Sequence, residues 1–395
     1  MTVNFKVKRL KVSEKFFFVG LFLWILQSYM IQTDFLKFYG YFPCTIVRVT
    51  SLSIFLFKII FIDKKYSKMI LSLSIVYLVI SVMVEFTTTE ITIDTFLNVF
   101  IIIMAARNIP FQKITNFVFV ISGLGFLITV SAAFLGILNN SALIMGGKKR
   151  YYLGFDYVSF APIYLVNIIF CGFYSYTTKK GKSVPWMYII VALFADILIY
   201  LLTSTRLAFG VVLIFICLYI IIEKLHMPIF KERWITKILS VILFPTIGIL
   251  TCWISNLYVP NNAKWIALNK LLSNRLLLNK RALMLYDINW FGQVIEVNTN
   301  LNAGIDNYMY IDSGYMNLLL QYGVIAFVVV LLLYSFILRN SVKRGNNVLT
   351  IWLFCICIYN IVNGMLLSPA TNSSLFAVWM FTTELKKRKK RWKLK

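Results

Sequence analysis

Nine lysine and arginine residues are concentrated in three short stretches of a chain in which acids are scarce. The whole sequence has 40 Lys and Arg but only 15 Asp and Glu. The planar guanidinium group of arginine can pair with two phosphate oxygens at once, while lysine supplies a compact point charge. Such a set suits a phosphate-bearing ligand, although the lysines could equally contact anionic lipid headgroups. The nine residues are Lys148, Lys149, Arg150, Arg206, Lys264, Lys270, Arg275, Lys280 and Arg281.

Three charged residues are notable because apolar blocks surround them. Arg206 follows Thr203–Thr205 in a tight hairpin between two long apolar blocks, so its side chain has little freedom to move away. Arg48 lies inside an apolar block near one end. A charge at such a position usually faces a polar interior, or extends to the interface along its stem. Asp196, near the middle of another block, is either neutral and hydrogen-bonded or paired with a cation such as Arg48.

Asp312 is the best-placed candidate for a general base. It begins the sequence Asp312–Tyr315 at the mouth of an apolar block, which predicts an acid anchored at a helix start. Aspartate also caps helices well, and capping is compatible with catalysis. The sole histidine, His226, lies in a short basic stretch, and the six cysteines show no Cys-x-x-Cys spacing. The sequence therefore disfavours a histidine base, a disulfide framework and a metal site.

The elements that must position these residues are membrane-spanning helices. The 395 residues are 60% hydrophobic and only 14% charged, with a mean hydropathy of +0.79. A bilayer core about 30 Å thick takes roughly 20 helical residues to cross. We predict an all-α, polytopic membrane domain over residues 1–395, with about twelve spans. They lie roughly at 16–33, 42–62, 68–85, 90–106, 114–138, 158–177, 185–204, 206–224, 236–256, 313–338, 348–366 and 372–385.

Membrane topology explains the net charge of +25 better than nucleic acid does. Cytoplasmic loops of membrane proteins carry an excess of Lys and Arg. With the N-terminus inside, the cytoplasmic segments hold 28 of the 40 Lys and Arg, and the outer loops hold 10. The opposite orientation would place the basic tail at 386–395 outside. We therefore predict that both termini are cytoplasmic.

Two of the outer loops contain most of the outer cations. Residues 139–157 join the fifth and sixth spans, and residues 257–312 join the ninth and tenth. The second loop has 56 residues, and loops beyond about 12–15 residues are uncommon unless they are functional. Within it, Ala263–Tyr286 has neither Pro nor Gly and predicts one continuous amphipathic helix, able to lie at the membrane surface.

Together these features resemble the Wzy-type polymerases of O-antigen and capsular polysaccharide, in the O-antigen polymerase and ligase superfamily. Arg150, Gly154 and Phe155 are similar to the Arg-x-x-x-Gly-Phe segment of that family. Ser204–Arg206 resembles its Ser/Thr-Arg hairpin. The large loop has an Arg-x10-Gly pattern from Arg281 to Gly292, followed by Asp312–Tyr315 and Gly323. Asp312 stands where ligase relatives often have a histidine, which favours a polymerase over a ligase.

The resemblance implies a GT-C-like fold and a multi-pass protein of the bacterial cytoplasmic membrane. It implies an inverting, metal-independent glycosyltransferase without cofactors, which joins undecaprenyl-diphosphate-linked repeat units. A flippase and a chain-length regulator are its implied partners, and nucleic acid is not expected. The expected catalytic residues are Arg206, Arg281 and Asp312, and the expected substrate-binding residues are Arg48, Arg150, Arg275, Tyr315, Gly154 and Gly292.

Two alternatives use the same membrane setting. A flippase for the same lipid-linked oligosaccharide would also need many spans and internal cations. However, transporters commonly show repeats with broken helices, and we find no internal repeat. A glycan ligase would use the same donor with a different acceptor.

The predicted topology places residues 257–312 outside. A single cysteine introduced at Asn298 or Asn302 should react with a membrane-impermeant maleimide in intact cells. Labelling that occurs only after permeabilisation would contradict both the topology and the mechanism that depends on it.

Overall fold

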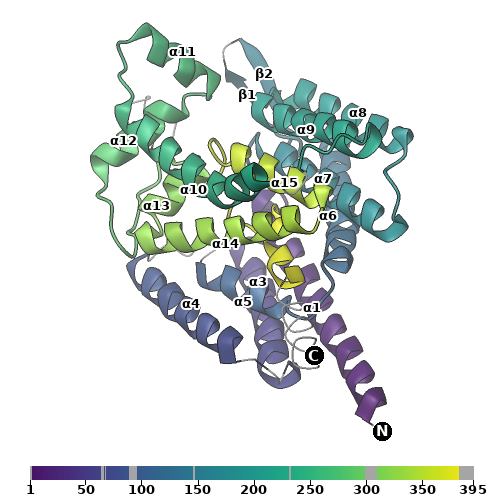
Figure 1. The fold of residues 1–395 in the computed structure, drawn as a ribbon. Coiled ribbons are helices and arrows are strands. Elements are labelled where there is room, and N and C mark those ends of the chain that lie inside the picture. The colour runs from purple at the N-terminus through teal and green to yellow at the C-terminus, as the bar shows by residue number, and fades with distance from the viewer. Residues whose placement is uncertain are drawn as a thin grey trace.

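In the computed structural model of the chain, the described residues are 2–63, 66, 68–88, 96–145, 147–230, 233–298 and 309–381. They are mostly helical, and the only sheet among them is one two-stranded hairpin (Figure 1). The basic tail predicted at 386–395 and part of the large outer loop lie outside the described residues.

Nine helices in the described part of the chain are long and apolar enough to cross a membrane, which confirms a multi-pass membrane protein. Two of them end in a π-helical turn, η1 (Lys58–Ile62) and η2 (Ile220–Lys224). The nine are α1 (Thr2–Gln32), α3 (Tyr41–Phe57), α4 (Lys68–Thr87), α6 (Phe111–Phe134), α7 (Phe160–Lys180), α8 (Trp186–Thr203), α9 (Arg206–Tyr219), α10 (Trp234–Leu257) and α14 (Gly323–Lys343).

The predicted count of twelve spans is not confirmed. The fourth and eleventh predicted spans correspond to α5 (Phe96–Ala105) and α15 (Asn347–Tyr359), with 10 and 13 residues. At 1.5 Å per residue, α15 reaches only about 20 Å, short of a core about 30 Å thick. Residues 89–95, just before α5, lie outside the described residues, so the full length of the fourth predicted span stays untested. The tenth predicted span also begins later than expected. A short helix, α13 (Gly314–Leu320), precedes α14, and the chain turns between the two.

The bundle is built around α7, the most enclosed of the long helices. In the most apolar stretch of α7, 83% of the residues are buried, whereas in that of α4 only 17% are buried. α7 packs beside α6, while α1 packs beside α3 and α10 beside α14 (Figure 1). Aromatic side chains fill the centre; the Phe170 ring, for example, lies 5.9 Å from that of Trp352.

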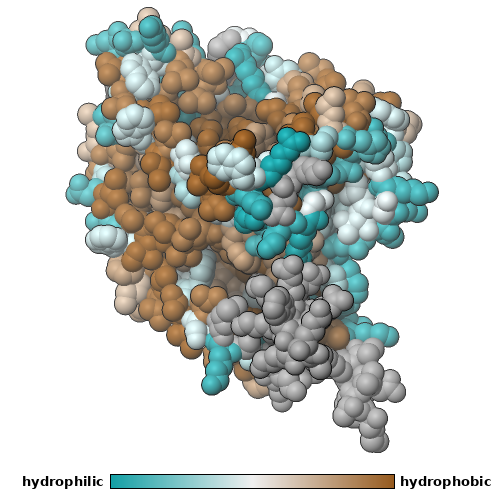
Figure 2. Space-filling view, viewed as in Figure 1, coloured by the Kyte–Doolittle hydropathy of each residue, from teal (hydrophilic) through white to brown (hydrophobic). Residues whose placement is uncertain are grey.

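The peripheral helices expose large apolar side chains, as expected for a surface that faces lipid. Leu73 on α4 is 62% exposed and Phe194 on α8 is 66% exposed. Apolar side chains cover the face formed by α4, α10 and α14 (Figure 2). A soluble monomer rarely exposes an apolar area of this extent, so hydrocarbon is the solvent that this surface requires.

Of the twelfth span predicted at 372–385, the structure describes residues 372–381, and residues 382–385 lie outside the described part of the chain. Residues 360–372 form turns without regular structure, and η5 (Ser373–Ala377) is a short 3-10 helix. Asn372, Ser373 and Ser374 are each 0% exposed, so this segment lies inside the protein. Non-helical backbone at membrane depth is tolerated only where the protein itself surrounds it.

Side-chain amides supply the hydrogen bonds that this buried segment needs. Asn167 of α7 donates to the carbonyl of Ala370 at 3.1 Å and accepts from the amide of Ser373 at 3.1 Å. Asn372 donates to the hydroxyl of Tyr334 in α14 at 2.7 Å. The segment is thereby fixed between α7 and α14.

The predicted outer connections gather at one end of the bundle. Residues 139–157 contain an unpredicted hairpin of β1 (Ala142–Met145) and β2 (Lys148–Tyr151). An isolated bridge pairs Thr33, after α1, with Phe155 beyond the hairpin. The short helix α2 (Leu36–Tyr39) follows that bridge. In Figure 1 the hairpin lies at the top of the view and α1 begins at the bottom.

The amphipathic helix predicted over Ala263–Tyr286 is broken, so that prediction is wrong. It consists of α11 (Ala263–Leu271) and α12 (Arg275–Leu285). Ser273 and Asn274 between them have positive φ angles of 54° and 66°, which interrupt the right-handed helix. Lys264 and Arg275 therefore do not share one continuous helical face.

The large loop returns to the bundle through a close contact between two glycines. Gly292 and Gly323 both have φ of +87°, and a Cβ added to Gly292 would lie 2.0 Å from the carbonyl oxygen of Gln321. The amide of Gln293 donates to that same oxygen at 3.2 Å. The structure gives Gly292 this packing position, and the prediction that it binds substrate stays untested.

We expect Gly292→Ala to lower the thermal stability of the purified protein more than Gly136→Ala does. Gly136 has a similar φ of +74° but nothing within 4 Å of an added Cβ. The control therefore carries only the left-handed strain of about 1–2 kcal/mol, while overpacking adds about 1–3 kcal/mol at Gly292. Equal shifts in melting temperature, measured in one detergent, would argue against the packing role.

Candidate functional site

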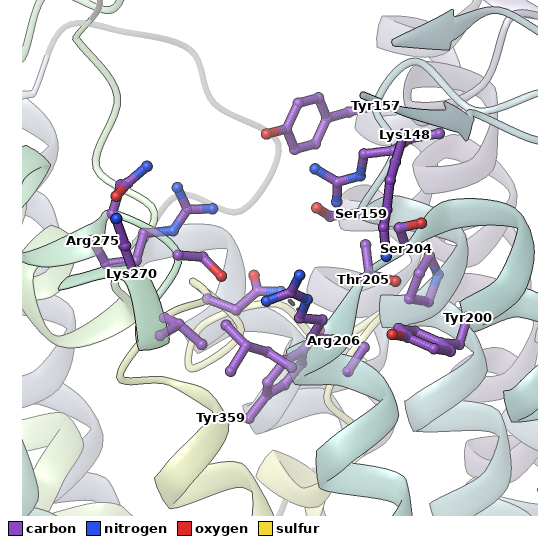
Figure 3. Close-up of a pocket in the computed structure, with 18 residues that line it drawn as sticks. Lys148, Tyr157, Ser159, Tyr200, Ser204, Thr205, Arg206, Lys270, Arg275 and Tyr359 are labelled. Atoms are coloured by element: carbon purple, nitrogen blue, oxygen red, sulfur yellow. Dashed lines mark hydrogen bonds between the residues drawn. The ribbon is translucent and has the colours of Figure 1, made fainter. Parts of the chain in front are cut away.

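A cavity of about 520 Å³ opens at the end of the bundle where the connections predicted to be outside meet. Among the described residues that line it are five cations from three separate connections. Lys148 and Arg150 come from the hairpin, Arg206 from the start of α9, and Lys270 and Arg275 from the large loop. In Figure 3, Lys270 and Arg275 lie on one side, Lys148 lies on the opposite side, and Arg206 lies between them.

The β-hairpin selects which of its three cations face the cavity. Side chains alternate along a strand, and accordingly Lys148 and Arg150 line the cavity while Lys149 does not. The Nε of Arg150 donates to the carbonyl of Thr203, at the end of α8, at 2.9 Å. This bond holds the guanidinium group of Arg150 beside the α8–α9 turn.

That turn directs the start of α9 at the cavity. Ser204 ends α8 in a left-handed conformation, with φ of 52°. The Thr205 hydroxyl is bonded to that of Thr203 at 2.6 Å and makes no capping bond to α9. Ser204, Thr205 and Arg206 all line the cavity. The start of a helix carries partial positive charge and free N–H groups, so it adds to the attraction for an anion.

The break between α11 and α12 brings the loop cations to the same place. The side chain of Asn269 accepts from the amide of Leu277 at 3.2 Å and donates to Asn274 at 3.2 Å, which fixes the break. Lys270 and Arg275, on either side of it, both line the cavity. A continuous helix would have turned them in different directions.

Asp312 lies behind Arg275, at the other foot of the large loop. Its Oδ2 is 2.7 Å from Nη1 of Arg275. Burial raises the pKa of the Asp312 carboxyl to about 6, although the charge of Arg275 opposes that rise. Ser313, rather than Asp312, is the N-cap of α13, because its hydroxyl accepts from the amide of Met316 at 3.5 Å. Capping therefore does not explain the presence of Asp312.

The arginines of the cavity affect one another. Burial lowers the pKa of Arg150, and the positive charges of Arg275 and Arg206 lower it further. The neighbouring Tyr157 raises the pKa of Arg150 in the opposite direction. Burial and then Asp312 raise the pKa of Tyr157, while Arg275 and Arg150 lower it. The phenol thus lies among these charged groups. Positive charge is in excess around the cavity, so binding of an anion would relieve the repulsion.

Three other predicted residues lie elsewhere. Arg48 is half-buried on α3, and neither it nor Arg281 of α12 lines the cavity. Tyr315 is 0% exposed, and its hydroxyl donates to the carbonyl of Cys357 at 2.8 Å. It therefore ties α13 to α15 and has no surface with which to contact substrate.

Gly154 has a structural position as well. Its φ is +82°, and an added Cβ would lie 3.0 Å from the carbonyl of Thr129. Its own carbonyl accepts from the amide of Asp34 at 3.0 Å. Gly154 thus allows the segment after Arg150 to pack closely on the end of α6.

Sequence reasoning missed the residues that close the bottom of the cavity. Tyr359, Val362 and Asn363 come from the end of α15 and the turns that follow it. Asn363 donates to the hydroxyl of Tyr359 at 3.0 Å. A tyrosine followed four residues later by an asparagine, inside an otherwise apolar block, is the signal that could have identified this pair.

Comparisons of the chain with protein-family models, with curated proteins and with solved structures found no match. The functional argument therefore depends on the geometry of the cavity and on the motifs in the sequence.

We expect Asp312→Asn to reduce the glycan-polymerising activity implied by the family resemblance by about 10²-fold or more. In the native protein this activity should fall as pH drops through about 6, because the carboxylate that pairs with Arg275 becomes protonated. The Asn variant should lack this dependence.

Glu296→Gln is the matched control, because Glu296 is an exposed acid of the same loop and does not line the cavity. If Asp312 acts through Arg275, the double variant Asp312→Asn/Arg275→Lys should be no worse than the more impaired single variant. An Asp312→Asn protein with native activity and the native pH profile would exclude Asp312 both as the general base and as the residue that positions Arg275.

Proposed function

We propose that the chain is a membrane glycosyltransferase, a Wzy-type polymerase that joins undecaprenyl-diphosphate-linked repeat units at the outer face of the bacterial cytoplasmic membrane. One observation carries the proposal: cations from three separate connections line a single cavity at one end of an apolar helical bundle. Binding of a lipid-linked diphosphate requires this combination of concentrated positive charge and an adjoining apolar bundle.

The cavity suits the departure of a diphosphate. A sugar hydroxyl of the acceptor attacks the anomeric carbon of the donor, and the bond to the diphosphate oxygen breaks. Negative charge then grows on the leaving group, and preorganised donors stabilise it most effectively. Arg206, Arg275 and Arg150 provide such donors, and the start of α9 adds its N–H groups. Because diphosphate is a weak base, its departure needs positive charge more than it needs a general acid.

The acceptor hydroxyl must lose its proton during the same step. Asp312 carries a carboxylate whose side chain is only 12% exposed and which lies next to Arg275. It supports the reaction either as the base or by holding Arg275 in position. Holding Arg275 in position requires less movement of the Asp312 side chain than acting as the base, because the ion pair between Asp312 and Arg275 already exists.

The closed bottom of the cavity favours an enzyme over a flippase. Tyr359 and Val362 line the cavity and are only 3% and 6% exposed, and Tyr359 lies below Arg206 in the view of Figure 3. A flippase must pass a large polar headgroup through this region. A glycan ligase would use the same donor site, and it differs only in the acceptor.

We expect Arg206→Lys and Arg275→Lys each to shorten or abolish the polymer, because lysine keeps the charge but loses bidentate pairing. The measurement is the length of the polysaccharide made when each variant is expressed in a deletion strain, at equal protein level. In the deletion strain itself, single repeat units should accumulate on lipid. Full-length chains left on lipid would indicate a ligase instead.

The hairpin provides the matched control. Lys148→Gln removes a cation that lines the cavity, whereas Lys149→Gln removes its exposed neighbour on the other side of the strand. We expect only the first to reduce polymer length. Equal effects of the two, or native polymer in both Arg→Lys variants, would contradict the assignment. Arg281→Lys tests separately whether that residue contributes, and its role stays a prediction.

A further inference from the structure

A second cavity, of about 560 Å³, lies between the outer ends of α10 and α14, beneath the end of α12. Its walls are mostly apolar. Ile249 and Trp253 of α10 are 58% and 57% exposed, while Leu319 and Phe327 at its back are 8% and 7% exposed. We call this cavity the lateral groove. Since α10 and α14 are both apolar enough to cross a membrane and their side chains at the mouth of the groove are exposed, we place this mouth against the hydrocarbon of the membrane.

The outer rim of the lateral groove carries a cation. Asn256 lines the groove near the end of α10. The ammonium group of Lys280, on α12, donates to the carbonyl of Asn256 at 2.6 Å and to its side-chain oxygen at 3.2 Å. Lysine has three N–H donors, so one remains for another ligand. Lys280 does not line the groove itself but reaches its rim through Asn256, while the exposed acid Asp287 lines the groove just beyond the end of α12. An apolar groove with an ammonium group at its rim fits a lipid whose anionic headgroup lies on the Asn256 side.

Helix α12 connects the lateral groove to the cationic cavity. Arg275 at its start lines the cavity, while Leu283 and Tyr286 line the groove. These two residues follow Arg275 by eight and eleven positions, or about 12 and 16 Å at 1.5 Å per residue. Each residue turns the helix by about 100°, so Lys280 lies about 140° around the helix from Arg275. The two cations therefore point in different directions from α12.

This separation matches a requirement of the proposed reaction. The acceptor attacks through a hydroxyl at one end of its oligosaccharide and carries its lipid diphosphate at the other end. The lipid of the acceptor must therefore lie one repeat unit away from the reacting carbon. The donor diphosphate, in contrast, must lie directly beside that carbon.

We propose that the lateral groove binds the first part of the polyprenyl chain of the acceptor, with Lys280 contacting its diphosphate, while the donor diphosphate occupies the cationic cavity. This inference rests on the proposed function. It assigns the donor diphosphate to the start of α12, the acceptor diphosphate to Lys280 in its middle, and the acceptor lipid to the groove beside its second half.

The test uses the full-length protein in nanodiscs and a polyprenyl diphosphate that carries a diazirine in its first isoprene units. After illumination, peptides of α10 and α14 that line the groove should be labelled. Ile249→Trp, which fills the groove, should reduce this labelling on the order of tenfold, the effect of about 1.4 kcal/mol of lost binding. Leu332→Trp is the control, because Leu332 on α14 is 57% exposed but does not line the groove.

A second measurement separates the groove from the proposed function. Lipid-linked repeat units extracted from the deletion strain are supplied to each variant, and the glycan formed is measured. Native glycan synthesis and native labelling in Ile249→Trp would overturn the groove assignment while leaving the polymerase intact. No glycan linkage formed by the wild-type protein would instead overturn the polymerase proposal.

A third probe distinguishes the acceptor from bulk lipid. A diazirine-bearing phosphatidylglycerol should label the groove weakly, and excess undecaprenyl diphosphate should displace it. Equal labelling by the phospholipid, without displacement, would mean that the groove holds ordinary membrane lipid and would overturn the inference.

Discussion

Backbone that leaves the helical hydrogen-bond pattern inside a membrane must find partners within the protein, and the rest of this structure depends on how residues 360–374 do so. Where its own turns leave a backbone group unpaired, the side chains of Asn167, Asn360 and Asn372 supply partners, and all three are almost fully buried. The carbonyl of Asn360 also accepts from the amide of Gly314 at 3.0 Å. The buried segment therefore holds α13 in place, and with it the adjacent Asp312.

The cavity above this segment concentrates positive charge that the folded protein does not fully neutralise. Asp312 is bound to Arg275, and the pKa of Arg150 is lowered by burial and by two neighbouring arginines. Like charges held together destabilise a fold unless rigid elements keep them in place. Here the hairpin, the start of α9 and the break before α12 each fix one part of the set. Binding of an anionic ligand therefore reduces the repulsion among these cations, which favours the bound state.

The sequence predicts the features that depend on composition and local order. Long apolar blocks predicted most of the membrane helices, and the scarcity of acids made the outer cations visible. Neither could predict which cations would meet, because that depends on tertiary contacts. Lys148 and Lys149 are identical in type and adjacent in sequence, and only the pairing of β2 with β1 separates their directions. The same holds for Lys270 and Arg275, which meet only because Ser273 and Asn274 adopt positive φ.

The glycines of the recognised motifs show a different limit of sequence reasoning. A motif records which residues occur together, without distinguishing a residue that contacts a ligand from one that permits a backbone contact. Gly154, Gly292 and Gly323 all have positive φ and closely packed surroundings. They bring the hairpin and the large loop against the bundle, and so they position the arginines without lining the cavity.

The large loop can place side chains accurately because rigid helices anchor part of it. Asn279 of α12 donates to the hydroxyl of Ser255 in α10 at 3.0 Å, and Ala282 packs in a small core with Met316 of α13. These contacts lie between Arg275, at one end of α12, and Tyr286, just beyond the other. A change in the position of α10 would therefore move the cationic cavity and the lateral groove together. The distance between the two sites is then set by one short helix.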